Sequence, residues 1–138
     1  MPSRQLRLTT WGALLLSAGL TLARAADTGH VTPQEAAKLV ADGKAVLVDV
    51  REKDEWAETG VAVPAHLLAT TDFNHNAKNW SDFLATVSDK TVITYCSAGI
   101  RAGRIADKLA TKGFKTASMG RFEDWTEAGL PVRKVDGK

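Results

Sequence analysis

The single cysteine of this chain, Cys96, is its clearest candidate for a nucleophile. The reactive form of cysteine is the thiolate, which is favoured at helix N-termini and beside positive charges. Many free cysteines instead pack as small apolar residues and take no part in chemistry. The residues around Cys96 therefore decide between a reactive thiol and a structural one.

The segment that follows Cys96 predicts a binding site for anions. Four residues, Ser97 to Ile100, separate it from Arg101, and they lie between a strand pattern and a helical pattern. A short loop at this position can turn backbone N–H groups inward, and the positive end of the following helix strengthens their attraction for anions. Arg101 adds a full positive charge at the rim. The predicted roles are catalytic for Cys96 and substrate-binding for Ser97, Ala98, Gly99, Ile100 and Arg101.

The histidines do not extend this site. None of the three is spaced as the base partner of a catalytic cysteine, and a thiolate held by N–H groups needs no such base. His66, Asp72 and His75 also lack the spacing of an established metal site. We expect neither a metal nor a cofactor.

Asp49 and Arg51 are candidates for support behind the cysteine loop. Asp49 is the polar member of the apolar run Ala45 to Val50, and a buried carboxylate needs hydrogen bonds or a charge partner. We expect Asp49 to bond backbone N–H groups or Arg51 beneath the loop. Arg51 could also line the mouth of the site.

The elements that must position these residues alternate between strands and helices. Thr32, Pro33 and Glu35 have the spacing of a capped helix start, and Asp42-Gly43 ends that helix. Apolar runs predict strands at Ala45–Val50 and Thr91–Tyr95, with a weaker strand at Lys115–Met119. Helical patterns lie near residues 54–58, 77–87, 101–113 and 122–128. This order predicts an α/β fold with three layers, a central mainly parallel sheet with helices on both faces.

Three other segments carry weaker expectations. Residues 61–76 show no regular pattern, and Lys134 to Lys138 is expected to be a frayed tail. Trp56, Trp80 and Trp125 fall on helical apolar stripes, so we expect them to pack in the core.

The first 25 residues have the organisation of a secretory signal peptide. Arg4 and Arg7 precede the apolar stretch Leu8 to Leu22, and Ala23-Arg24-Ala25 supplies the small residues of a cleavage site. A retained membrane anchor is the alternative, but the stretch is short for a bilayer. We therefore predict a signal peptide at residues 1–25, a single domain at residues 26–138, and a periplasmic or secreted location.

Charge argues against a nucleic-acid partner. The whole chain has a formal net charge of +2, but three basic residues and no acidic residue lie in the first 25 positions. From Ala26 onward, fifteen basic and sixteen acidic residues give a net charge of −1. Binding to nucleic acid needs a concentrated basic face, which this balance does not favour.

Four motifs together resemble the rhodanese family in order and spacing. They are Val48-Asp49-Val50-Arg51-Glu52, the loop from Tyr95 to Ala102, Arg121 to Trp125, and Ala128 to Val132. The resemblance covers residues 31–132. It implies a central parallel sheet with helices on both sides, and a transfer of sulfane sulfur through a persulfide on the cysteine. Cys96 matches the family's nucleophile, and Ser97 to Arg101 match its cradle.

The loop length separates this pattern from its nearest rival. Cysteine phosphatases, including the rhodanese-like ones, place five residues between cysteine and arginine, whereas this chain has four. The shorter cradle suits one sulfur atom better than a phosphate group.

The sequence departs from the family pattern at three places. Val61 to His66 replaces the usual His-Ile-Pro-Gly-Ala, and Arg121 replaces the second glycine of a Gly-Gly pair. Ser97 and Ala98 stand where two-domain rhodaneses that use thiosulfate have basic residues. We therefore question whether thiosulfate is used efficiently.

These observations predict a sulfurtransferase. It would move sulfur from a small anionic donor such as thiosulfate to cyanide or a thiol, through a persulfide on Cys96. The alternative is a protein that relays persulfide to a protein partner without turnover, or a redox-sensing thiol module. No nucleic acid partner, and no membrane after removal of the signal peptide, is expected.

Overall fold

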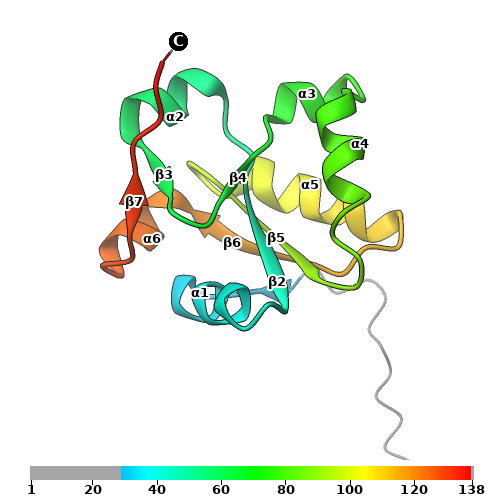
Figure 1. The fold of residues 1–138 in the computed structure, drawn as a ribbon, viewed down its shortest axis with the longest axis horizontal. Coiled ribbons are helices and arrows are strands. Elements are labelled where there is room, and N and C mark those ends of the chain that lie inside the picture. Colours follow the sequence, from blue (N-terminus) through cyan, green and yellow to red (C-terminus); the bar gives the residue numbers. More distant parts are fainter. Residues whose placement is uncertain (1–28, 138) are drawn as a thin grey trace, which may run out of the picture.

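A five-stranded, fully parallel sheet forms the centre of the protein in the computed structural model, which describes residues 29–137 (Figure 1). The predicted signal peptide lies outside the described residues. The strands run in the order β1-β6-β5-β2-β4, and each neighbouring pair is parallel. Their bounds are β1 Gly29–His30, β2 Ala45–Asp49, β4 His66–Leu67, β5 Thr91–Cys96 and β6 Thr116–Arg121. A second, antiparallel pair joins β3 (Val61–Ala62) to β7 (Val132–Arg133).

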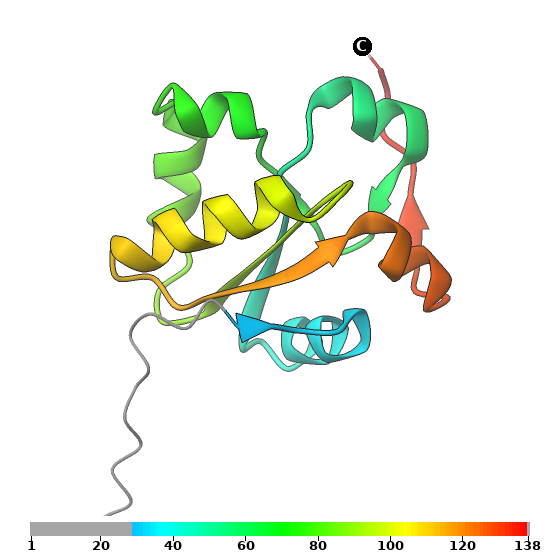
Figure 2. The ribbon, with the colours of Figure 1, turned by 180° about the vertical axis from the view of Figure 1, so that it is seen from behind.

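Helices cover both faces of the central sheet, so the predicted three-layer α/β architecture is confirmed (Figures 1 and 2). One face packs against α1 (Pro33–Ala41) and α6 (Phe122–Glu127). The other packs against α3 (Thr70–Asn74), α4 (Lys78–Leu84) and α5 (Ile100–Thr111). The remaining helix, α2 (Lys53–Thr59), follows β2 and carries the buried Trp56.

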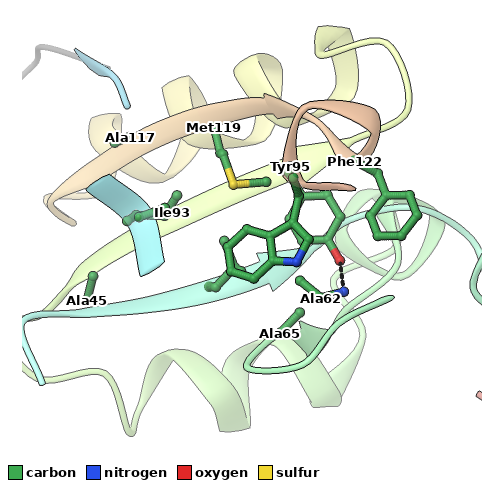
Figure 3. Packing of buried hydrophobic residues seen from close by; sticks show 11 residues of the cluster. Ala45, Ala62, Ala65, Ile93, Tyr95, Ala117, Met119 and Phe122 are labelled. Atoms are coloured by element: carbon green, nitrogen blue, oxygen red, sulfur yellow. Dashed lines mark hydrogen bonds between the residues drawn. The ribbon is translucent and has the colours of Figure 1, made fainter. Parts of the chain in front are cut away.

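Alternation along β5 divides its side chains between the two cores. Ile93 and Tyr95 face the cluster beneath α1 and α6, whereas Val92 and Cys96 belong to the cluster beneath α5. Figure 3 shows the first of these cores, where the Tyr95 hydroxyl accepts a hydrogen bond of 3.0 Å from the backbone N–H of Ala62. Both faces of the strand are buried, as expected for a central strand of a parallel sheet.

The predicted start of α1 is confirmed in detail. Thr32 is the N-cap, Pro33 occupies the first turn, and the Thr32 hydroxyl and Glu35 carboxylate exchange hydrogen bonds with each other's backbone N–H groups. Asp42 caps the other end. The strands at β2, β5 and β6 and the helix α5 also lie within one or two residues of their predicted bounds.

Two expectations about irregular segments are wrong. Residues 61–76 contain β3, β4 and α3, each of five residues or fewer, too short for a periodic pattern to reveal. The C-terminal segment after Arg133, expected to be a frayed tail, instead packs at Val135. This residue is partly buried against the cluster of Trp56, Val61 and Ala69. Trp56, Trp80 and Trp125 are buried as expected. Within residues 29–137, no helix is both long and apolar enough to cross a bilayer.

Candidate active site

Cys96 is the last residue of β5, a strand with neighbours on both sides in the sheet. The chain then leaves the carboxyl edge of the sheet and turns into α5, which begins at Ile100 and packs back on β5 and β6 (Figure 2). Ligands of open α/β sheets bind at this edge. The fold thus brings the cysteine to the place where a site is expected.

The thiol of Cys96 faces backbone N–H groups. Its Sγ atom accepts hydrogen bonds from Gly99 N–H at 3.1 Å and from Ala102 N–H at 3.4 Å. The residue is 1% exposed and belongs to the core beneath α5. Two N–H groups that point at the same sulfur atom form a site that is complementary to negative charge at this position.

The loop between Cys96 and α5 keeps these donors in place. Gly99 is the N-cap of α5 with a φ angle of +91°, a left-handed conformation that favours glycine. The Thr94 hydroxyl donates a 2.8 Å hydrogen bond to the carbonyl of Ala102, tying β5 to the first turn of the helix. Ser97 and Ala98 are exposed, and Ile100 is 66% exposed. The loop therefore presents an open surface above a buried sulfur atom.

Arg101 does not stand free at the rim. Its two terminal nitrogens donate to the two carboxylate oxygens of Glu55 at 2.7 and 2.8 Å. Arg101 lowers the pKa of Glu55 to about 2, and Glu55 in turn raises the pKa of Arg101, as do the nearby Cys96 and Glu52. Arg101 thus supplies the expected positive charge near Cys96, but it forms an ion pair with Glu55. The side chains of Arg101 and Glu55 are similarly exposed.

Ser97 belongs to the same group of contacts. Its hydroxyl donates to Glu55 at 2.8 Å, and it accepts from Arg101 at 3.3 Å. One carboxylate on α2 thus holds both ends of the cysteine loop, Ser97 at the start and Arg101 at the beginning of α5.

Asp49 and Arg51 form the expected pair, and both are buried. The guanidinium group donates from Nε at 3.0 and 3.1 Å and from one terminal nitrogen at 2.7 Å, and the backbone N–H of Arg51 donates to the same carboxylate at 3.0 Å. Arg51 is only 2% exposed, so the expectation that it could line the mouth of the site is wrong. Although burial opposes its charge, the bonds to Asp49 leave the pKa of Arg51 raised.

The rest of the Arg51 side chain explains its orientation. It donates to the carbonyl of Gly60 and to the hydroxyl of Thr59, both at 2.8 Å. Its guanidinium lies 4.4 Å from the centre of the Phe122 ring. Gly60 is required here, because a Cβ atom would lie 2.7 Å from the carbonyl oxygen of Arg133. Arg51 therefore fixes the C-terminal end of α2 against the rest of the protein.

Two residues of the site were not predicted from the sequence. Ala102 supplies an N–H group to Sγ, one residue beyond the predicted cradle. Glu55 contacts Arg101 across a separation of 46 residues. Glu55 lies three residues after Glu52, and the two form a capping box at the start of α2. That local spacing does not predict a contact between Glu55 and the distant cysteine loop.

Over the described part of the chain, no three histidine, cysteine, aspartate or glutamate side chains gather in a group that could hold a metal ion.

Comparison with known proteins gives a consistent family signature. A sequence model described as "Rhodanese-like domain" matches residues 32–128. Thiosulfate sulfurtransferase GlpE of Actinobacillus succinogenes is 30% identical over 111 residues, covering 78% of this chain and 93% of that protein.

Solved structures agree with this result. The polysulfide-sulfur transferase of Wolinella succinogenes, described as a homodimer, has a TM-score of 0.60 and 26% identity, covering 80% of this chain and 82% of that one. A rhodanese-related protein from Thermoplasma volcanium has a TM-score of 0.62 at 19% identity, covering 76% of this chain and 97% of that one, a likeness of fold.

Proposed function

Because this chain belongs to the rhodanese family, we propose that it transfers sulfane sulfur through a persulfide carried on Cys96. The family match and the similarity to GlpE support a sulfurtransferase activity. The single observation that carries the proposed mechanism is the position of Sγ against the N–H groups of Gly99 and Ala102. These donors suit a thiolate and, one bond further out, a terminal persulfide sulfur.

The proposed reaction has two half-reactions. With thiosulfate, the Cys96 thiolate attacks the outer sulfur, a bond forms between Sγ and that sulfur, and sulfite leaves with the electron pair of the broken S–S bond. In the second step, cyanide or a thiolate attacks the terminal sulfur of the persulfide. Thiocyanate or a new persulfide leaves, and the Cys96 thiolate is regenerated. Splitting the transfer in this way is the usual advantage of covalent catalysis.

We propose that the donor is a small anion and that the final acceptor is cyanide, a thiol or a persulfide-accepting protein. No cofactor, nucleic acid or membrane is required by this chemistry. Residues 1–25 are proposed to direct export, so the mature chain from Ala26 would act in the periplasm or outside the cell. N-terminal sequencing of the protein recovered from the producing cell tests this cleavage site.

A turnover assay tests the proposed activity. The protein and a Cys96→Ser variant are supplied with thiosulfate and cyanide, and thiocyanate is followed over time. We expect thiocyanate formation above the uncatalysed rate for the native protein and none for the variant. Equal rates for the two proteins, with several sulfane donors tried, would overturn the proposal.

A further inference from the structure

Glu55 makes an unusually complete set of contacts at the edge of the cysteine loop. Its carboxylate accepts four hydrogen bonds, two on each oxygen, from Arg101 twice, from the Ser97 hydroxyl and from the backbone N–H of Glu52. An ionised carboxylate has about four lone-pair sites. Glu55 is therefore saturated, and its negative charge is held in one position.

The position of that charge matters because it offsets the cation expected to attract an anionic donor. Arg101 directly precedes Ala102, whose backbone N–H donates to the sulfur of Cys96 at 3.4 Å. Both side chains of the Arg101–Glu55 pair are about 30% exposed, at 30% and 27%, so a donor that approaches the loop meets both charges. Glu52 also interacts with Arg101, which adds a second negative charge on this side.

The arginine on the neighbouring strand is compensated in the same way. Arg121 lies beside Cys96 in the register between β5 and β6. Its guanidinium pairs with Asp124 at 2.7 Å and with Glu123 at 3.4 Å. Arg101, in the first turn of α5, and Arg121, at the end of β6, thus both have carboxylate partners.

We propose that Glu55 is a specificity-determining residue that directs Cys96 toward persulfide donors of low charge and away from the thiosulfate dianion. The inference rests on the proposed sulfur transfer through Cys96 and adds to it the class of the preferred donor. A donor with two negative charges is repelled by Glu55 twice as strongly as a donor with one. It also gains less from Arg101, because two of the guanidinium N–H groups already bind Glu55.

The preferred half-reaction balances without any further reactant. The Cys96 thiolate attacks the terminal sulfur of an alkyl persulfide anion, and a bond forms between Sγ and that sulfur. The S–S bond of the donor breaks, and the alkyl thiolate leaves with its electron pair. One thiolate and one persulfide are consumed, and one of each is produced.

Single-turnover loading of Cys96 tests this inference. The protein is mixed with either thiosulfate or 2-hydroxyethyl persulfide, without an acceptor, and the gain of one sulfur atom is followed by intact mass. For Glu55→Gln we expect thiosulfate to load about tenfold faster than in the native protein, equivalent to about 1.4 kcal/mol in the barrier. Loading from the persulfide should change less than about threefold, on the same scale.

Two matched variants separate charge from structure. Glu58→Gln removes a carboxylate from an exposed position on the same helix and should leave the ratio of the two loading rates unchanged. Glu55→Asp retains the charge on a shorter side chain and should keep the native preference. A role in holding the loop alone would alter both donors equally in Glu55→Gln, and that result would overturn the inference.

Ionic strength provides a test on the native protein, independent of how well the variants fold. Salt screens charges near the surface, so the ratio of thiosulfate to persulfide loading should rise with salt more steeply than the same ratio for a free uncharged thiol, 3-mercapto-1-propanol. An equal rise contradicts the role of Glu55. Failure of every donor to load native Cys96 would instead overturn the proposed function itself.

Discussion

Two arginine–carboxylate pairs lie at the same end of this protein and have different structural roles. Arg51 and Asp49 are 2% and 0% exposed, are two residues apart in the sequence, and fix the corner between β2 and α2. Arg101 and Glu55 are 30% and 27% exposed, are 46 residues apart, and join the cysteine loop to α2. The bonds themselves have similar lengths, so burial and connectivity make the difference.

The two pairs are also linked through α2. Arg51 binds the carbonyl of Gly60 and the hydroxyl of Thr59 at the C-terminal end of this helix, and Glu55 lies in its first turn. The buried pair thus positions the element that carries the exposed pair. Charge at the surface can tune donor preference at little cost in stability, provided that the buried pair keeps its geometry.

The largest effect is expected from breaking the buried pair. Asp49→Asn leaves the Arg51 guanidinium buried without a counter-charge, which typically costs about 3–5 kcal/mol of the free energy of unfolding. Urea denaturation measures this loss.

The control for this variant is Asp82→Asn, which breaks the exposed Lys78–Asp82 pair on α4. Such surface pairs contribute about 0.3–0.5 kcal/mol. Similar losses in the two variants would remove the distinction between the buried and exposed pairs.

A smaller loss is expected from Tyr95→Phe, beside the buried pair. The Tyr95 hydroxyl is the acceptor for the buried N–H of Ala62 (Figure 3), and its removal leaves that donor unsatisfied. The cost of such a group is about 1–3 kcal/mol. Thermal unfolding monitored by circular dichroism measures it. An unchanged melting temperature would mean that water replaces the hydroxyl and that this core is less closed than its burial indicates.

A more modest effect on stability, with a defined dependence on pH, is expected from Glu55→Gln. Arg101 lowers the pKa of Glu55 from its ordinary value of 4.5 to about 2, so the folded state favours the ionised carboxylate. The stabilisation is therefore present above about pH 4.5 and is lost as the pH falls toward 2. Because the pair is partly exposed to solvent, we expect a difference of only about 1 kcal/mol between the native protein and the variant at pH 7.

Unfolding experiments at several pH values check this expectation. The difference between the two proteins should shrink as the solution is acidified below pH 4.5. A difference that stays constant down to pH 2 would show that the Arg101–Glu55 bond does not depend on the charge of Glu55.

The same contrast explains what the sequence could predict. The strand that ends at Cys96, the loop and the helix after it are consecutive, so local patterns correctly predict the order of these three elements. Asp49 and Arg51 are two residues apart, and a lone carboxylate in an apolar strand needs a partner nearby. The bond between Glu55 and Arg101 depends on how α2 packs beside the cysteine loop, which no local pattern records. The strands β3, β4 and β7 have two residues each and show no periodicity.

The most direct test of the central claim is the mass of the intact protein after exposure to a sulfane donor alone. We predict that the native protein gains the mass of one sulfur atom, that cyanide removes it as thiocyanate, and that Cys96→Ser gains nothing. A native protein that stays unmodified with both thiosulfate and an alkyl persulfide would contradict sulfur transfer through Cys96. A gain of sulfur that persists in Cys96→Ser would contradict it equally.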